Sequence, residues 1–105
     1  METIEIFELS GKLDVIGSKE IQKEIIPNLV KNGKVIIDMS DCFYVSSSGL
    51  RVLLIVAKQS AMQGCETVLA GVQQMVWDVI AMTGFEDMLE SYPTVDEAIR
   101  ALEER

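Results

Sequence analysis

The chain has 105 residues, of which 49% are hydrophobic and 25% charged, and its formal net charge is −8. This length and composition predict one globular domain spanning residues 1–105. Nucleic acids and anionic membranes are disfavoured as partners, because both are bound through basic residues, whereas a basic protein partner fits an acidic chain.

The N-terminal part of the chain predicts a strand followed by an irregular helix. Apolar residues separated by glutamates predict the strand over residues 3–9. Apolar residues at helical spacing predict the helix over residues 18–32, with Gly17 or Ser18 as its N-cap. Pro27 has no N–H to donate, so we expect a kink or an irregular turn just before it.

The middle of the chain predicts two strands around a buried helix. Asn32-Gly33 ends the preceding helix, with glycine supplying the left-handed conformation. The β-branched run within residues 34–39 predicts a central strand covered on both faces. Residues 50–63 predict a helix that is apolar on nearly all sides, and residues 66–70 predict another strand.

The C-terminal part predicts two helices with a strand over residues 88–92 between them. The helix after Gly71 has apolar residues at helical spacing, namely Val72, Met75, Val76, Val79 and Ile80. We expect Met75, Met82 and Met88 to be core residues rather than an adaptable binding face. Thr94 and Glu97 form a capping box that opens the last helix, whose apolar stripe is Val95, Ala98, Ile99 and Leu102.

Strands and helices therefore alternate along the whole chain. This order predicts an α/β domain whose central strands are mostly parallel, with right-handed crossovers. The longest apolar run, residues 52–57, is much shorter than the ~20 residues of a membrane-spanning helix. The start, Met1-Glu2-Thr3, is acidic where a secretory signal is basic, so we expect a cytoplasmic protein.

Residues for metal or redox chemistry are scarce. The sequence contains no histidine, which removes the commonest metal ligand and the usual general base. Cys42 and Cys65 have no CxxC spacing, so we expect two free thiols that fill the core, and we predict neither a metal nor a cofactor.

The distinctive motif is the serine run Ser46-Ser47-Ser48-Gly49 at the start of the buried helix. One serine is enough to cap a helix, so three leave at least one hydroxyl that capping does not explain. A helix N-terminus also tolerates an anion, and a phosphoserine there adds about −1.5 to −2 charges. The motif is thus compatible with a plain serine cap or with a phosphorylation site.

The stretch from Lys34 to Leu54 resembles the core motif of STAS domains, which are the domains of bacterial anti-sigma factor antagonists and their relatives. Further segments resemble other parts of the family in the same order: Leu9–Asp14, Thr67–Val72, Met82–Phe85 and Tyr92–Ala98. The resemblance covers almost the whole chain. It implies a four- to five-stranded mixed, mostly parallel sheet with about four helices.

The resemblance also implies a mechanism. An unmodified antagonist binds an anti-sigma factor, which is often a serine kinase, and so releases the sigma factor. The kinase phosphorylates the antagonist and abolishes binding, and a protein phosphatase reverses this. The matching phosphoacceptor in this chain is Ser47.

The residues expected to contact the partner are Asp14, Asp38, Ser46, Ser48 and Gly49. Both aspartates are expected at the carboxyl ends of strands, where ligand sites of α/β sheets form, although Asp14 could equally close an Asx turn. Gly49 is expected to allow close approach of a backbone or a partner.

Family members usually have one more strand before the segment that matches residues 3–9. Without it, we expect a less protected sheet edge, through which a homodimer could form. Two functional alternatives stay open. One is a phosphorylation-independent STAS subunit of a lipid-transport or stress-signalling complex, and the other is an enzyme with Ser47 as nucleophile, for which no adjacent base is evident.

Overall fold

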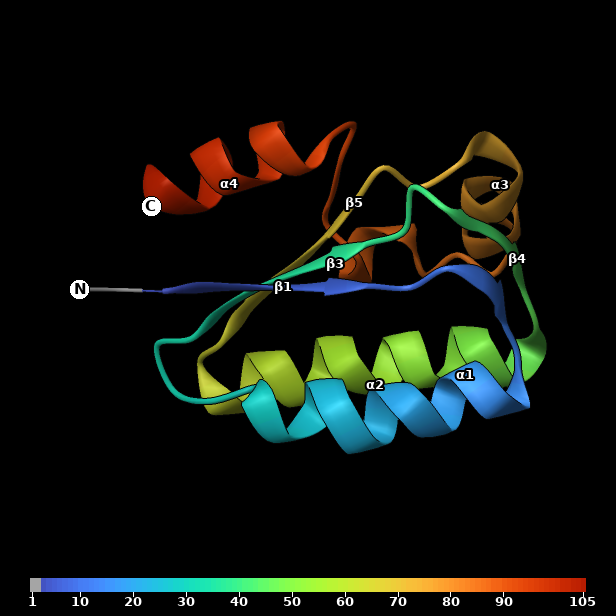
Figure 1. Ribbon diagram of the computed structural model, residues 1–105, viewed down its shortest axis with the longest axis horizontal. Coiled ribbons are helices and arrows are strands. Elements are labelled where there is room, and N and C mark those ends of the chain that lie inside the picture. Colours follow the sequence, from blue (N-terminus) through green and yellow to red (C-terminus); the bar gives the residue numbers. More distant parts are fainter. Residues whose placement is uncertain (1–2) are drawn as a thin grey trace.

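A computed structural model describes residues 3–105, so the acidic start of the chain, Met1-Glu2-Thr3, lies mostly outside the described residues. A four-stranded sheet runs through the middle in the order β1-β3-β5-β6 (Figure 1). Its strands are β1 (Ile4–Glu8), β3 (Lys34–Asp38), β5 (Glu66–Ala70) and β6 (Ser91–Tyr92). Every strand pair in the described part of the chain is parallel, so the α/β expectation is confirmed without an antiparallel member.

Helices cover both faces of the sheet (Figure 1). On one face lie α1 (Val15–Glu20), which continues as η1 (Ile21–Ile25) and η2 (Ile26–Asn28), and α2 (Ser47–Gln63). On the other lies α4 (Val95–Glu103), while α3 (Gln74–Met82) packs near β4 at one end of the molecule. The larger core cluster lies between the sheet and the α1–α2 layer, and a smaller one lies under α4.

The first helix differs from its prediction at both ends. It begins at Val15 because Asp14, and neither Gly17 nor Ser18, is the N-cap. It ends at Asn28, before the predicted residue 32, and Asn32 rather than Gly33 adopts the left-handed conformation, with φ 63°. The expected irregularity near Pro27 is confirmed, because the chain passes through a π-helical turn, η1, and then a 3-10 turn, η2.

Two short strands were not predicted. β2 (Gly11–Leu13) and β4 (Cys42–Val45) form a separate two-stranded parallel sheet from segments that lie between the predicted elements. The register shifts between Gly11 and Lys12, which leaves Phe43 without a directly opposite residue. This bulge places Cys42 and Val45 inward and leaves Phe43 and Tyr44 exposed.

The C-terminal third also differs in detail. The predicted strand over residues 88–92 is mostly a 3-10 turn, η3 (Glu86–Met88), followed by the two residues of β6. The expectation that Met75, Met82 and Met88 lie in the core is wrong, because all three are exposed. Only Val76 and Ile80 of α3 are buried, while Trp77 packs partly against the core.

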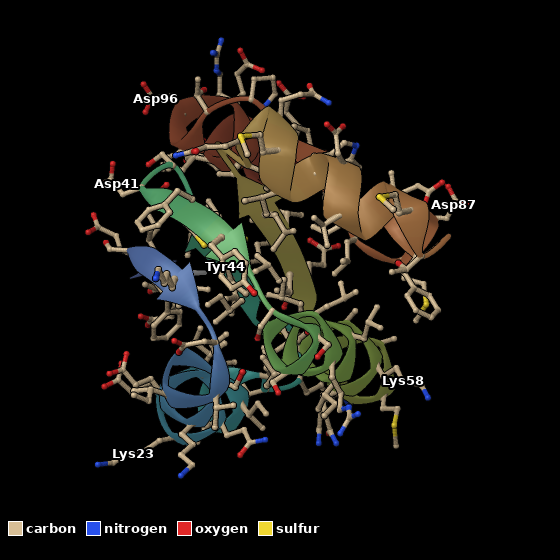
Figure 2. All side chains as sticks on the ribbon, turned by 90° about the vertical axis from the view of Figure 1, so that its right-hand side faces the viewer. Lys23, Asp41, Tyr44, Lys58, Asp87 and Asp96 are labelled. Atoms are coloured by element: carbon tan, nitrogen blue, oxygen red, sulfur yellow. The ribbon has the colours of Figure 1, made fainter. Side chains whose placement is uncertain are left out.

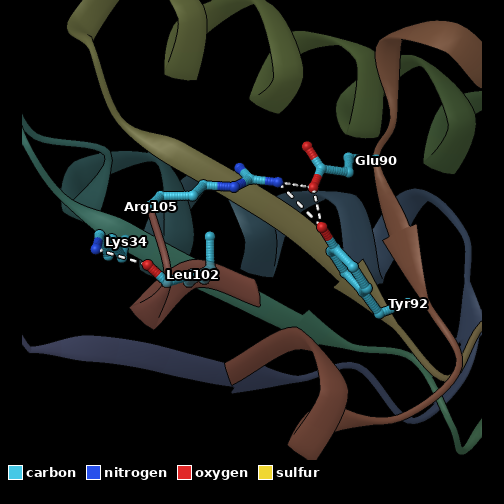
Figure 3. Close-up of polar contacts among 5 residues, drawn as sticks. All are labelled: Lys34, Glu90, Tyr92, Leu102 and Arg105. Atoms are coloured by element: carbon cyan, nitrogen blue, oxygen red, sulfur yellow. Dashed lines mark hydrogen bonds and ion pairs between the residues drawn. The ribbon is translucent and has the colours of Figure 1, made fainter. Parts of the chain in front are cut away.

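Polar contacts fix the C-terminal helix to the sheet (Figure 3). The buried Lys34 of β3 donates from Nζ to the carbonyl oxygen of Leu102 at 2.7 Å. Arg105 pairs with Glu90, and its Nη2 also donates to the Tyr92 hydroxyl at 3.0 Å. At the start of α4, the Thr94 hydroxyl accepts from the N–H of Glu97 at 3.1 Å, so the predicted threonine cap is confirmed.

Candidate functional site

The end of β2 and the start of α2 are joined through Ser46. Its backbone N–H and its hydroxyl both donate to the carbonyl oxygen of Leu13, at 2.9 and 3.2 Å. The same hydroxyl accepts from the N–H of Gly49 at 3.1 Å and so caps α2. The Ser46 side chain is therefore fully used by the fold.

This arrangement gives each serine of the run a different position. Ser46 is the cap, so α2 begins at Ser47, three residues before the predicted start at Leu50. Ser47 is exposed, and its hydroxyl makes no hydrogen bond to any residue that the structure describes. Ser48 is half-buried and lines a shallow groove. Ser47 is thus the serine of this run that is both accessible and unused.

Gly49 is required by close packing inside the molecule. A Cβ on this residue would lie 2.2 Å from the carbonyl oxygen of Leu13 and 2.8 Å from the Leu13 Cγ. Gly49 is buried, so the close approach that the sequence predicted is made by the backbone of Leu13. The absence of a side chain at Gly49 lets the start of α2 pack against the end of β2.

Exposed apolar side chains lie on two elements next to the start of α2, namely α1 and β4. Val15 and Ile16 begin α1, and Phe43 and Tyr44 belong to β4. Figure 2 looks onto this end of the molecule, with Tyr44 between the α1–α2 layer and α3. These four exposed apolar side chains, together with Ser47, are called the Ser47 surface below. Sequence reasoning missed these four residues: Phe43 and Tyr44 are exposed at the unpredicted bulge, and Val15 and Ile16 belong to a helix that begins earlier than predicted.

A groove between α1 and α2 extends the Ser47 surface. It has a volume of about 240 Å³, and Val15 and Ser48 lie at its lining together with the cations Lys19 and Arg51. Arg51 lies four residues after Ser47 on α2, the spacing at which side chains on a helix are neighbours. In Figure 2 the labelled lysines lie on the α1–α2 side, whereas Asp41 lies at the start of β4, Asp87 beside α3 and Asp96 on α4.

The two predicted aspartates lie in different places. Asp14 follows β2 and accepts from the N–H groups of Ile16 and Gly17, at 3.1 and 3.3 Å, so it is a capping residue next to the Ser46 junction. Asp38 ends β3 and accepts from the N–H and the hydroxyl of Ser40, at 3.0 and 2.7 Å. The carbonyl oxygen of Ser40 in turn accepts from Gln73, which connects Asp38 to the loop before α3.

The cysteines and acidic residues form no reactive centre in the described residues. Cys42 and Cys65 are buried free thiols, as expected, and burial raises the pKa of the Cys42 thiol. Residues 3–105 contain no cluster of three or more metal-ligating side chains. None of the helices in that range is both long and apolar enough to span a membrane.

Comparison with known proteins identifies the family. The family model of the STAS domain matches residues 2–98. The chain belongs to the STAS domain family. The fold of the STAS domain therefore agrees with the expectation from the sequence motifs.

Two curated proteins are similar to this STAS domain in sequence. BtrV of Bordetella bronchiseptica, which carries the name of an anti-sigma factor antagonist, is 32% identical over 78 residues, covering 73% of this chain and 67% of BtrV. The anti-sigma-B factor antagonist of Listeria monocytogenes is 28% identical, covering 83% of this chain and 76% of the relative.

Among solved structures, the anti-sigma factor antagonist SpoIIAA in its unphosphorylated form superposes with a TM-score of 0.78. That match covers all of this STAS domain and 94% of SpoIIAA at 20% identity, so it shows the shared fold. Both sequence relatives carry names of anti-sigma factor antagonists.

Proposed function

We propose that this STAS domain is an anti-sigma factor antagonist that binds an anti-sigma factor with serine kinase activity through the Ser47 surface. In the proposal, the partner phosphorylates Ser47 and is thereby released, and a protein phosphatase restores binding. The observation that carries the proposal is the position of Ser47 in the first turn of α2, exposed and without a hydrogen bond to the described residues.

The local structure can accept a phosphate without rearrangement. Ser46 retains the cap, so modification of Ser47 removes no hydrogen bond between described residues. The N-terminus of α2 carries partial positive charge, and Arg51 lies one turn further along. A phosphoserine at this position is therefore favourable for the fold.

The same phosphate is unfavourable for a docked partner. It adds about −1.5 to −2 charges beside the exposed apolar side chains Val15, Ile16, Phe43 and Tyr44. A partner that covers these side chains would have to bury a dianion, and burial of an unpaired charge is very costly. Among the other predicted contact residues, Ser48 offers its half-buried hydroxyl, and Ser46, Asp14 and Gly49 fix the backbone beside Ser47. Asp38 instead accepts hydrogen bonds from Ser40, which is outside the Ser47 surface.

The test compares variants of Ser47 with a charge control on the same helix. Affinity for the anti-sigma factor encoded nearest to this chain's gene is measured by calorimetry for wild type, Ser47→Ala, Ser47→Asp and Gln63→Glu. Gln63→Glu also adds one negative charge, but at the other end of α2. We expect Ser47→Asp to weaken binding by about a hundredfold or more, which is ~2.7 kcal/mol, while the other two variants bind like wild type.

A second measurement tests the modification itself. Incubation with the same anti-sigma factor and ATP is expected to add one phosphoryl group to wild type and none to Ser47→Ala, as read by mass spectrometry. Wild-type affinity of Ser47→Asp, together with no mass gain, would overturn the proposal. That pair of results, with capture of a transport ATPase, would instead support the phosphorylation-independent STAS subunit.

We also propose that two copies can pair through β1. β1 is an edge strand of the described sheet, and Ile6 on it is exposed. Because each copy carries a net charge of −8, repulsion opposes association and salt should strengthen it. Sedimentation velocity should show a dimer at high salt that is lost in Ile6→Lys. A monomer at all salt concentrations would contradict pairing.

A further inference from the structure

The outer face of α3 is apolar. Met75, Val79 and Met82 are 77, 39 and 86% exposed, and their spacing of four and three residues places them on one side of the helix. Val76 and Ile80 are buried on the side that faces the core. α3 therefore has one apolar face inside the protein and a second one directed to solvent.

A second, solvent-exposed apolar face on a short helix is typical of a binding surface. Large exposed apolar side chains scattered singly are ordinary, but three in one stripe form a continuous patch. Two of the three are methionines, whose flexible thioether side chains adapt to different apolar surfaces. Phe85, which is also exposed, follows the helix and extends the patch. We call Met75, Val79, Met82 and Phe85 the α3 stripe.

The charges around the α3 stripe are acidic. Asp78 is exposed and lies three residues after Met75 and four before Met82, within the same face. Glu86 and Asp87 follow in η3, and Figure 2 shows Asp87 beside the end of α3. Between Lys58 and Arg100 the sequence contains no lysine or arginine at all. The segment that carries the α3 stripe therefore contains no lysine or arginine that could neutralise Asp78, Glu86 and Asp87.

The geometry points to a basic amphipathic helix of another protein as the occupant of the α3 stripe. Apolar side chains at helical spacing would cover the stripe, and flanking lysines or arginines would pair with Asp78 and Asp87. A second copy of this chain is a poorer occupant, because its net charge is also −8. The α3 stripe does not include Ser47, so this binding is independent of the phosphorylation proposed above.

The test uses synthetic peptides of about 18 residues, which form five helical turns. One peptide arranges leucine and lysine as an amphipathic helix, a second has the same composition in scrambled order, and a third replaces lysine by glutamate. Trp77 lies on α3 and is the single tryptophan of the chain, so its fluorescence reports binding there, and calorimetry gives the affinity.

The variants separate the stripe from general attraction to an acidic protein. The double variant Met75→Ser, Met82→Ser removes the two most exposed side chains of the stripe. Met62→Ser is the matched control, because Met62 is 80% exposed but lies on α2. Circular dichroism verifies that the variants are folded, which is expected since the changed residues lie outside the core clusters.

We expect the amphipathic lysine peptide to bind wild type and Met62→Ser equally, and the double variant about tenfold or more weakly. The scrambled and glutamate peptides should bind much more weakly than the amphipathic one. Equal binding of the scrambled peptide, or undiminished binding by the double variant, would overturn the inference. Ser47→Asp should bind the peptide like wild type, and loss of binding there would contradict the independence of the two surfaces.

Discussion

The carbonyl oxygen of Leu13 accepts two hydrogen bonds from Ser46, one from its backbone N–H and one from its hydroxyl. These bonds join residues that are 33 positions apart and attach the start of α2 to the end of β2. Because Ser46 is used in this way, the neighbouring Ser47 is left without a structural role in the described fold. The accessibility of Ser47 is thus a consequence of the bonding of Ser46.

Ser46→Ala should destabilise the domain by about 1–2 kcal/mol, since it removes the α2 cap and the side-chain bond to Leu13. Ser48→Ala is the matched control and should change the free energy of unfolding by about 0.5 kcal/mol or less. Urea unfolding followed by circular dichroism measures both. An equal decrease in the free energy of unfolding for Ser46→Ala and Ser48→Ala would show that the Ser46 cap does not contribute specifically to stability.

Gly49→Ala should destabilise the domain by about 3 kcal/mol or more, because the added Cβ would overlap with the Leu13 backbone. Gly64→Ala provides the comparison at the other end of α2. A Cβ there meets open space, but φ is 72°, so we expect a loss of about 1–2 kcal/mol from backbone strain alone. A smaller loss for Gly49→Ala than for Gly64→Ala would contradict the packing account.

Ser47→Asp should leave the domain as stable as wild type or stabilise it by about 0.3–1 kcal/mol at low salt, because a carboxylate is favourable at a helix N-terminus. Gln63→Glu, near the C-terminus of α2, should act in the opposite direction. Thermal unfolding at low and high salt measures both effects, which salt should diminish. Unfolding of Ser47→Asp under native conditions would mean that its loss of partner binding reports misfolding.

The buried Cys42 should make stability depend on pH in the alkaline range. Burial raises the pKa of its thiol above the ordinary value of 9.0, so the unfolded chain loses this proton first as pH rises. The stabilising contribution is complete below pH 9.0 and is lost as pH rises towards the folded-state pKa. Between pH 8 and 10 the midpoint temperature of thermal unfolding should fall more steeply with pH for wild type than for Cys42→Ala.

If the unfolding temperatures of wild type and Cys42→Ala fell equally with pH, the result would contradict the elevated pKa of the Cys42 thiol. Thiol labelling offers an independent check, because the protonated, buried thiol should react slowly in the native protein and rapidly after unfolding. Other groups that titrate in this range contribute equally to both proteins. The comparison with Cys42→Ala therefore isolates the thiol.

Local sequence signals predicted the long, periodic elements well. A β-branched run and an apolar run lie within β3 and β5, which they predict, and the capping threonine immediately precedes α4. The same holds for the break at Pro27, since the missing N–H acts within one turn of its own helix. The serine motif also marked the correct place on the chain.

Tertiary structure decided which residues of each motif are used. β2 and β4 are only three and four residues long, and each is stabilised by the other across about thirty residues of sequence, so neither has a local signal of its own. Whether Met75 and Met82 lie in the core depended on which face of α3 meets the sheet, and an apolar residue on either face looks the same in sequence. The sequence by itself determined the alternation of elements and placed the helix starts to within a few residues, because backbone propensity and periodicity act over a few residues. Which serine caps and which is exposed was decided by the distant carbonyl oxygen of Leu13, because a hydrogen bond forms only where the fold brings donor and acceptor together.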